Sequence, residues 1–426
     1  MHPTLAHDLE TLLDIASAAQ AIALEFLRNV DAVPPARTPS KAPDAIAATD
    51  ASVGIGAEGA LDLFRTQWLP HLAGSAGPRP PASLVGDWLT STVDQNPTSN
   101  WDSEAPSFER ETVASLAKWF RLPSHTGSFV TGATMSNFVG LAIAREWVGR
   151  QRGVQVITDG VAALGPVCIF AGSPHSSIYN ATSMLGLGRS CVRVVPASRE
   201  AIDVDALDAA LTEACHGTSC IVVASAGTIN TGDFDDFQGS RSNIRFGCMW
   251  TARSALDLTL APLVVGMDEA NSVCIDCHKW MNVPYDSAVQ FTRHQDLQVS
   301  VFHNTAVYLG NVAATPKFVH LTPLNSRRWR ALAAGFSVVA YGRDGHAEII
   351  RRNVECARLL ASQLSELTNQ VTVLAEHGAV CRDVKTLAWL QQLTDTCAVF
   401  LTPTVVRAAF SNWGTTTAHD IDVSSK

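Results

Sequence analysis

The residue with the clearest chemical potential is a lysine that follows a short apolar segment. Lys279 comes after the stretch Ser272–Ile275 and stands between His278 and Trp280. Bulky apolar neighbours lower the pKa of a lysine amine by partial burial, and the free amine is a nucleophile that condenses with carbonyl groups. Lys279 is therefore a candidate imine-forming residue, although a lone lysine is more often an ordinary surface residue.

Three further groups of polar residues follow predicted strands. Gly132, Ala133 and Thr134 open a helix after a strand, where backbone N–H groups and a hydroxyl can hold a phosphate. His175 follows another strand and could lie over a flat cofactor ring, while Thr228 ends a third strand. Taken alone, each fits a structural role better. Together with the amine they form the set that a phosphate-bearing aldehyde cofactor requires.

The elements that must position these residues alternate along the middle of the chain. Short apolar strands, of which residues 220–225 are the clearest, alternate with helix-like segments from about residue 87 to residue 293. This pattern predicts an α/β domain with a parallel sheet, in which ligands bind at the carboxyl ends of the strands. We expect an N-terminal helical segment (1–85), a large cofactor-binding domain (86–330) and a small α+β C-terminal domain (331–426).

Composition excludes several classes of protein. Of the 426 residues, 46% are hydrophobic and 17% are charged, whereas about 25% is usual for charged residues, so a disordered chain is excluded. The net charge of −9 argues against a nucleic-acid surface, and no apolar run approaches the about 18 residues of a membrane span. Ten cysteines are too sparse for a disulfide scaffold, and no secretory signal is visible. We expect a cytoplasmic protein with reduced thiols.

The motifs resemble those of the group II pyridoxal-phosphate-dependent amino acid decarboxylases, the family of the aromatic-L-amino-acid and glutamate decarboxylases. The most specific match is Asp276-x-His-Lys-Trp280, followed by Asn282-Val-Pro-Tyr-Asp286. The similarity covers nearly the whole chain, and its stretches are 85–96, 130–145, 173–188, 222–237, 270–286, 326–330 and 410–422.

The resemblance implies a fold, a cofactor and a reaction. The fold would be the α/β fold type I of pyridoxal-phosphate-dependent transferases, with a mainly parallel central sheet, assembled as a homodimer. The cofactor would be pyridoxal 5'-phosphate, and the reaction the α-decarboxylation of an L-amino acid to an amine and CO2. An aromatic substrate is favoured over glutamate, because no arginine is clearly placed for a distal carboxylate. No metal, membrane or nucleic acid is implied.

The resemblance also implies roles for the residues named above. Lys279 would bond covalently to the cofactor aldehyde, and His175 would stack on the ring and assist protonation of the carbanion. Thr228 would contact the ring side of the cofactor. The phosphate would be held by three groups, namely the Ala133 amide, the Thr134 hydroxyl and the His278 ring.

One residue that the family needs is missing. A carboxylate normally pairs with the pyridine nitrogen, and it lies in a Trp-Leu/Met-His-Val-Asp strand between the Thr228 and Lys279 elements. Residues 238–257 contain no such motif, so we expect the chain to lack this carboxylate and a central strand. Asp257 and Asp268 are candidate replacements without the motif. We therefore expect weak cofactor binding and weak or absent decarboxylation.

The codons of this segment suggest a cause. We read the codons in a frame that starts at the third base of each codon. In this frame, the triplet that joins Met249 to Trp250 encodes Val, and the triplet that joins Trp250 to Thr251 encodes Asp. Flanking codons allow the shifted frame to encode Trp-Met-His-Val-Asp-Gly-Ala-Phe-Gly. We hypothesise that residues from about 238 to about 263 are translated out of frame. A gene that cannot encode His-Val-Asp in the alternate frame would rule this out.

Other interpretations stay open for the same residues. Cys274-Ile-Asp-Cys277-His278 matches the Cys-x-x-Cys-His pattern of covalent haem attachment, which would make an electron-transfer protein. A catalytically inactive homodimer with the same fold is a second alternative. An aminotransferase or a carbon–carbon lyase that uses Lys279 is a third.

Three residues further along the chain than Lys279 are also candidates for functional roles. Arg327 and Arg328 could bind a phosphate or carboxylate, and they could equally form salt bridges at a domain junction. Tyr308 lies where the family carries a mobile loop with a catalytic tyrosine.

Overall fold

The computed structural model divides the chain into two compact units. One unit comprises Met1–Pro78 and Cys381–Arg407, and the other comprises Arg79–Val380 and Ala408–Lys426. The domain boundaries expected from the sequence stay a prediction. The structure describes all residues except 35–53, 75–78, 99–102, 198, 216–218, 229–230, 239–246, 251–255, 257–258, 305–314, 368–371, 374–378, 383–405, 409–411 and 416–426.

The N-terminal part of the first unit is helical where it is described, as the N-terminal sequence predicts. Its α-helices are α1 (Pro3–Glu10), α2 (Leu12–Arg28) and α3 (Gly56–Leu63), with short turns of helix at Val30–Ala32, Phe64–Trp68 and Leu69–His71. The Asp8 carboxylate of α1 accepts the Ala57 N–H at 3.1 Å, which satisfies a free donor at the start of α3. The leucines of α1 and α2 remain largely exposed, Leu13 at 80%.

The second unit is built on a seven-stranded sheet with strand order β1-β7-β6-β5-β4-β2-β3. Strands β3, β2, β4, β5 and β6 are mutually parallel, and β7 is antiparallel to both of its neighbours. The strands are β1 (Thr126–Val130), β2 (Ile169–Ala171), β3 (Val192–Val194), β4 (Ile221–Ser225), β5 (Gly247–Trp250), β6 (Ser272–Asp276) and β7 (Ala288–Thr292). The predicted α/β class with a mainly parallel sheet is confirmed.

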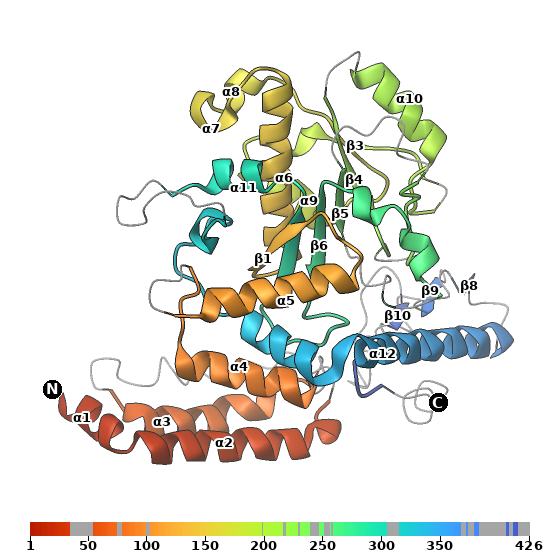
Figure 1. Ribbon diagram of the computed structural model, residues 1–426. Coiled ribbons are helices and arrows are strands. Elements are labelled where there is room, and N and C mark those ends of the chain that lie inside the picture. The colour runs from red at the N-terminus through yellow and green to blue at the C-terminus, as the bar shows by residue number, and fades with distance from the viewer. Residues whose placement is uncertain are drawn as a thin grey trace. The chain divides into compact units, whose positions relative to one another are not determined.

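Helices cover both faces of this sheet (Figure 1). Helix α6 (Ala133–Gln151) packs with α9 (Ser176–Met184) and α11 (Gln295–Phe302) in a core that includes Ile169 and Val223. On the other face, α5 (Ala105–Trp119) packs on Val273 and Ile275 of β6 together with α12 (Ala331–Leu367). All five residues of β6 are buried, as expected for a strand covered on both faces.

The remaining elements frame this three-layer core. Helix α4 (Pro81–Val93) packs against α12. The other elements are α7 (Val156–Asp159), α8 (Val161–Leu164), α10 (Val204–Cys215), and short 3-10 turns at Arg189–Cys191, Ala261–Val264, Met267–Glu269 and Phe318–His320. A second sheet has the order β10-β9-β8 and consists of β8 (Thr372–Val373), β9 (Ala379–Arg382) and β10 (Val406–Ala408).

Two expectations from the sequence are wrong. The central strand is present: β5 forms a parallel ladder with β4 and with β6, although its sequence lacks the family motif. A strand forms through backbone pairing with its neighbours and does not require one particular set of side chains, and here β4 and β6 supply that pairing. Cys220 is disulfide-bonded, so not all thiols are reduced. In the part of the chain that is described, no helix has the length and apolar character to cross a bilayer.

Candidate active site

Four loops at one edge of the sheet carry the residues singled out in the sequence. Strands β1, β2, β4 and β6 run in the same direction, because β7 is antiparallel to both β1 and β6. Ala133 therefore follows the carboxyl end of β1, His175 that of β2, Thr228 that of β4 and Lys279 that of β6. The expectation that these polar residues share one edge is confirmed in this backbone sense.

Lys279 is held at this edge by an acidic residue of its own strand. Its Nζ atom lies 2.7 Å from Oδ2 of Asp276, the last residue of β6, whose side chain is only 1% exposed. The other carboxylate oxygen accepts the Ala133 N–H at 2.9 Å. One carboxylate thus contacts both the amine and the first residue of α6. The Lys279 side chain as a whole is 37% exposed.

The ring of His278 is fixed beside the same contacts. Its Nδ1 lies 2.9 Å from the Ser287 carbonyl oxygen and 3.9 Å from Asp276 Oδ1, and the ring packs on Tyr285 at a centroid distance of 4.7 Å. Because the carbonyl can only accept, Nδ1 carries a proton. His278 is therefore oriented within reach of the α6 N-terminus, whose Gly132 approaches the ring.

His175 caps helix α9 and is oriented by a chain of hydrogen bonds. The Ser177 N–H donates to His175 Nδ1 at 3.2 Å, and the Ser177 hydroxyl lies 2.7 Å from the same nitrogen. Asn137 of α6 donates to that hydroxyl at 2.9 Å. Burial and the Lys279 ammonium lower the pKa of His175, while the Asp276 carboxylate opposes them. The ring is accordingly neutral near pH 7, with its proton on Nε2.

Thr228 lies in a tightly bonded turn after β4. Its hydroxyl accepts the Asp233 N–H at 2.9 Å and pairs with the Thr231 hydroxyl at 2.9 Å. The buried Asp235 carboxylate anchors the turn by accepting the Ser225 N–H at 2.7 Å, and burial raises the pKa of Asp235. Strand β5 separates this turn from the strand that carries Lys279.

The loop after Lys279 is fastened to distant parts of the second unit. Asn282 has a left-handed backbone conformation (φ 56°), and its Oδ1 accepts the Trp413 N–H at 3.1 Å. The Ser83 hydroxyl of α4 donates to the Asn282 carbonyl at 3.3 Å. Asp286, at the end of the loop, receives two hydrogen bonds from Arg330 at 3.0 and 3.1 Å.

Sequence reasoning missed two residues of this site. Asp276 was visible as the first residue of the motif that ends in Trp280, but its contact with Ala133 joins residues 143 positions apart. Arg79 donates to the His278 carbonyl at 3.3 Å and lies over the Tyr285 ring at 5.2 Å. No local pattern marked Arg79, because it follows a Pro- and Gly-rich stretch.

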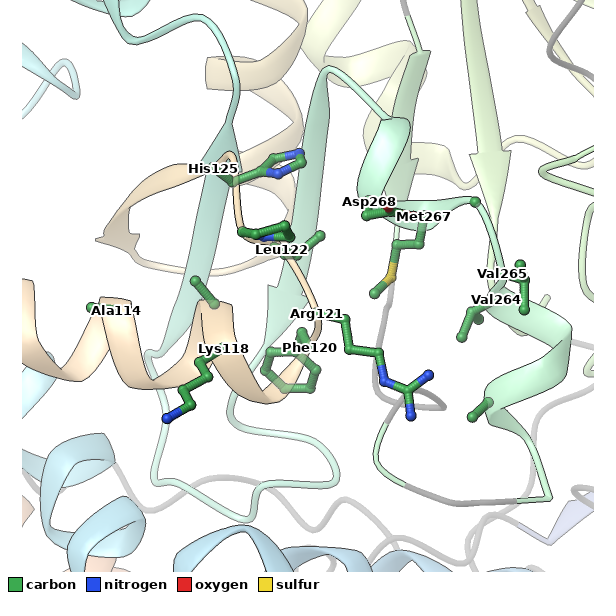
Figure 2. A pocket seen from close by; sticks show the side chains of 14 residues that line it. Ala114, Lys118, Phe120, Arg121, Leu122, His125, Val264, Val265, Met267 and Asp268 are labelled. Atoms are coloured by element: carbon green, nitrogen blue, oxygen red, sulfur yellow. The ribbon is translucent and has the colours of Figure 1, made fainter.

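The candidate replacements for the missing carboxylate do not fill its place. Asp268 precedes β6 and lies at the opposite edge of the sheet from Lys279, so that candidate is wrong. Asp268 lines a separate pocket of about 640 Å³. Figure 2 shows its side chain there, among the same lining residues as His125 and Arg121. Asp257 lies outside the described residues, as does Tyr308. Strand β5 ends at Trp250, in register with Ser225 and Cys274.

The structure explains the Cys-x-x-Cys-His pattern and the two neighbouring arginines, Arg327 and Arg328, without ligand binding. Cys274 and Cys277 are 3% and 0% exposed, so neither thiol can reach a haem, and burial raises the pKa of Cys274. Arg327 binds the Glu109 carboxylate in the core, and Arg328 pairs with Asp87 at 2.7 Å. The salt-bridge interpretation of both arginines is confirmed.

The fold and this edge of the sheet define a protein of the pyridoxal-phosphate-dependent fold type I. The family described as "Pyridoxal-dependent decarboxylase conserved domain" matches residues 75–385, and this chain belongs to it. The cofactor of the family is pyridoxal 5'-phosphate, and its reaction is the decarboxylation of amino acids.

Individual relatives are distant. The L-2,4-diaminobutyrate decarboxylase of Acinetobacter baumannii is 25% identical over 352 residues, covering 74% of this chain and 68% of that protein. The aromatic-L-amino-acid decarboxylase of Bacillus atrophaeus is 26% identical over 330 residues, covering 73% and 66%. The chain thus spans about two thirds of the length of these relatives. A crystal structure of Oryza sativa TDC with PLP and tryptamine shares the fold, with a TM-score of 0.87, 18% identity and coverage of 100% and 97%.

The described residues fit pyridoxal phosphate at two points. The Ala133 N–H at the start of α6 already binds an anionic group, the Asp276 carboxylate, as expected of a phosphate-binding helix N-terminus. The Lys279 amine contacts the same Asp276 carboxylate as the Ala133 N–H, and the lysine side chain is partly exposed. The residues fit the phosphate and the aldehyde of the cofactor, whereas the strand end beside them, at Trp250, lacks a carboxylate for the ring nitrogen.

Proposed function

We propose that this chain is a pyridoxal-phosphate-dependent α-decarboxylase of an L-amino acid. The proposal depends on one observation: the Lys279 amine, the α6 N-terminus and the neutral His175 ring are grouped at the carboxyl edge of one sheet. Lys279 and His175 would be catalytic. The cofactor would be bound by Lys279 and His175 together with four further residues, namely Ala133, Thr134, His278 and Thr228.

Each group has a part that its surroundings support. Bound pyridoxal phosphate supplies an electron-withdrawing ring, which lets the bond between the α-carbon and the carboxylate break. Lys279 is the nucleophilic amine, and Asp276 keeps it at the end of β6. His175 has its proton on Nε2 because Nδ1 accepts from Ser177. The Nε2–H can donate a hydrogen bond into the site, and His175 would assist protonation of the α-carbon as a general acid once it carries a second proton.

An aromatic amino acid is the substrate that we favour. Two arginines of the site loops are already engaged, Arg79 with the His278 carbonyl and Arg330 with Asp286. The charge of Arg330 is balanced by Asp286, which disfavours its pairing with the second carboxylate of an acidic substrate. The similarity to an aromatic-L-amino-acid decarboxylase is in keeping with this choice, and the similarity to a diaminobutyrate decarboxylase makes basic substrates the first alternative.

We further propose a homodimer with weak turnover. The exposed leucines of α1 and α2 form an apolar surface that association would bury, with Leu5 and Leu9 each 62% exposed. Weak turnover follows from the sequence at the end of β5, where Trp250 and Thr251 offer no carboxylate to the ring nitrogen. A catalytically inactive dimer with this fold is the second candidate, and it rests on the same gap.

Absorbance, reductive labelling and CO2 release test the proposal on the full-length chain. With added pyridoxal phosphate, borohydride should label Lys279, and CO2 should be released from aromatic L-amino acids. Lys279→Met should abolish both, whereas Lys317→Met, outside the site, should change neither. Labelling without CO2 release from any amino acid would favour the inactive dimer. No labelling of Lys279 would contradict the proposed function.

A further inference from the structure

The phosphate-binding position at the start of α6 contains a negative charge that belongs to the protein. Asp276 Oδ1 accepts the Ala133 N–H at 2.9 Å, and Oδ2 lies 2.7 Å from Lys279 Nζ. The side chain is 1% exposed, so water screens this charge poorly. The amide expected to hold the cofactor phosphate and the amine expected to hold its aldehyde therefore share one carboxylate.

A cofactor phosphate would bring a second anion to the same N–H group. Two negative groups at one buried donor repel each other, and the interaction is strong where solvent is excluded. The nearby charges do not remove this conflict: Lys279 contacts the other carboxylate oxygen, and His278 Nδ1 is 3.9 Å from the carboxylate while bonded to Ser287. His175 is kept neutral by burial and by Lys279.

We infer that Asp276 is a positioning residue that competes with the cofactor phosphate. Before the cofactor binds, Asp276 satisfies the α6 N-terminus and holds Lys279 in place as an ammonium. The carboxylate has to leave the Ala133 N–H when the phosphate arrives, so the phosphate contributes little to affinity. This inference rests on the proposed function and concerns how the same site takes up its cofactor.

Two ligands separate the effect on the phosphate from the effect on the amine. Removing the Asp276 charge also removes the contact of the Lys279 amine with its carboxylate partner, which affects the binding of any aldehyde. Pyridoxal has the aldehyde and the ring but no phosphate, so it reports the effect on the amine alone. The ratio of the dissociation constants for pyridoxal and pyridoxal phosphate therefore isolates the contribution of the phosphate.

The test uses fluorescence titration of the full-length chain with pyridoxal phosphate and with pyridoxal. Asp276→Asn, which keeps the size of the side chain, should raise the affinity ratio in favour of pyridoxal phosphate by about tenfold or more. Asp276→Ala should move it in the same direction, so the test does not depend on one variant folding. Asp268→Asn, which removes the same charge at the opposite edge, should leave the ratio within about twofold.

The outcomes are distinguishable. An unchanged ratio in both Asp276 variants, or a ratio that shifts in favour of pyridoxal, would overturn the role of Asp276 and leave the proposed function standing. Binding without borohydride labelling of Lys279 in any variant would overturn the proposed function, and this inference with it.

Discussion

Arg327 places two guanidinium nitrogens on the two carboxylate oxygens of Glu109, each at 2.9 Å. Both side chains are completely buried. The Phe129 N–H of β1 donates to Glu109 Oε1 at 3.1 Å, and Arg327 also donates to the Pro97 carbonyl at 2.8 Å. This pair therefore joins helix α5, strand β1 and the segment before α12 within the second unit.

Removal of one partner of this pair should strongly destabilise the second unit. Arg327→Met leaves the Glu109 carboxylate buried without its counter-ion, and we expect the free energy of unfolding to fall by about 3–5 kcal/mol. Arg328→Met, which breaks a partly exposed pair with Asp87, should cost about 1 kcal/mol or less. Urea unfolding of the two variants measures the difference, and equal losses would show that the buried pair has no special role.

Acid should weaken the fold through His346 of α12. Burial lowers the pKa of His346 to about 4, below the 6.5 of an exposed ring. Between these values the unfolded chain binds a proton that the folded chain does not. The contribution of His346 to the free energy of unfolding should therefore be at its maximum above pH 6.5 and should fall by about 3 kcal/mol as the pH drops to 4.

Replacement of the ring should remove this part of the pH dependence. His346→Phe should flatten the stability curve between pH 6.5 and 4, while Ser337→Ala, which removes the hydroxyl 3.2 Å from His346 Nε2, should keep its slope. Thermal melts across the pH range measure both variants. The same acid slope in His346→Phe and in the unaltered chain would contradict the assignment.

Asn282 should be sensitive to both its backbone and its side chain. Its φ of 56° costs an alanine about 1–2 kcal/mol, and loss of the hydrogen bond to the Trp413 N–H adds about 1 kcal/mol. We expect Asn282→Ala to lower the free energy of unfolding by about 2–3 kcal/mol. Asn282→Gly, which tolerates this φ, should lose only the hydrogen-bond part. Denaturant unfolding that finds glycine as harmful as alanine would disprove the backbone argument.

Repair of the segment around β5 should restore catalysis. Replacing residues 246–254 with Trp-Met-His-Val-Asp-Gly-Ala-Phe-Gly puts a carboxylate at the end of β5, where Trp250 is in register with Ser225 and Cys274. We expect CO2 release to rise by about 100-fold or more, since a carboxylate paired with the ring nitrogen would stabilise the negative charge that the ring takes up. The matched control is the same replacement with Asn in place of Asp. If the control is as active, the missing carboxylate is not the defect.

Much of the site could be predicted from the sequence because it depends on local signals. The motif around Lys279 and the order of strands and loops placed Ala133, His175 and Thr228 at the same edge, since parallel strands end together. The bond between Asp276 and Ala133 could not be predicted, because it requires β6 to lie beside the start of α6. The choice between ligand binding and salt bridging at Arg327 depended in the same way on Glu109, 218 residues earlier.

The error at β5 has a different origin. The strand was judged by the motif that Gly247–Trp250 lacks, whereas its pairing with β4 and β6 depends on the backbone. A short apolar run gives a weak strand signal by itself, and the neighbouring strands decide the outcome. The absence of the motif therefore bears on chemistry and leaves the sheet intact.

The central claim is that the amine of Lys279 bonds to pyridoxal phosphate. Borohydride reduction of the full-length chain with the cofactor, followed by peptide mapping, tests it most directly. We predict a phosphopyridoxyl label on Lys279, faint in the chain as it stands and strong in the repaired variant. A label on another lysine, or no label even after repair of residues 246–254, would contradict the account.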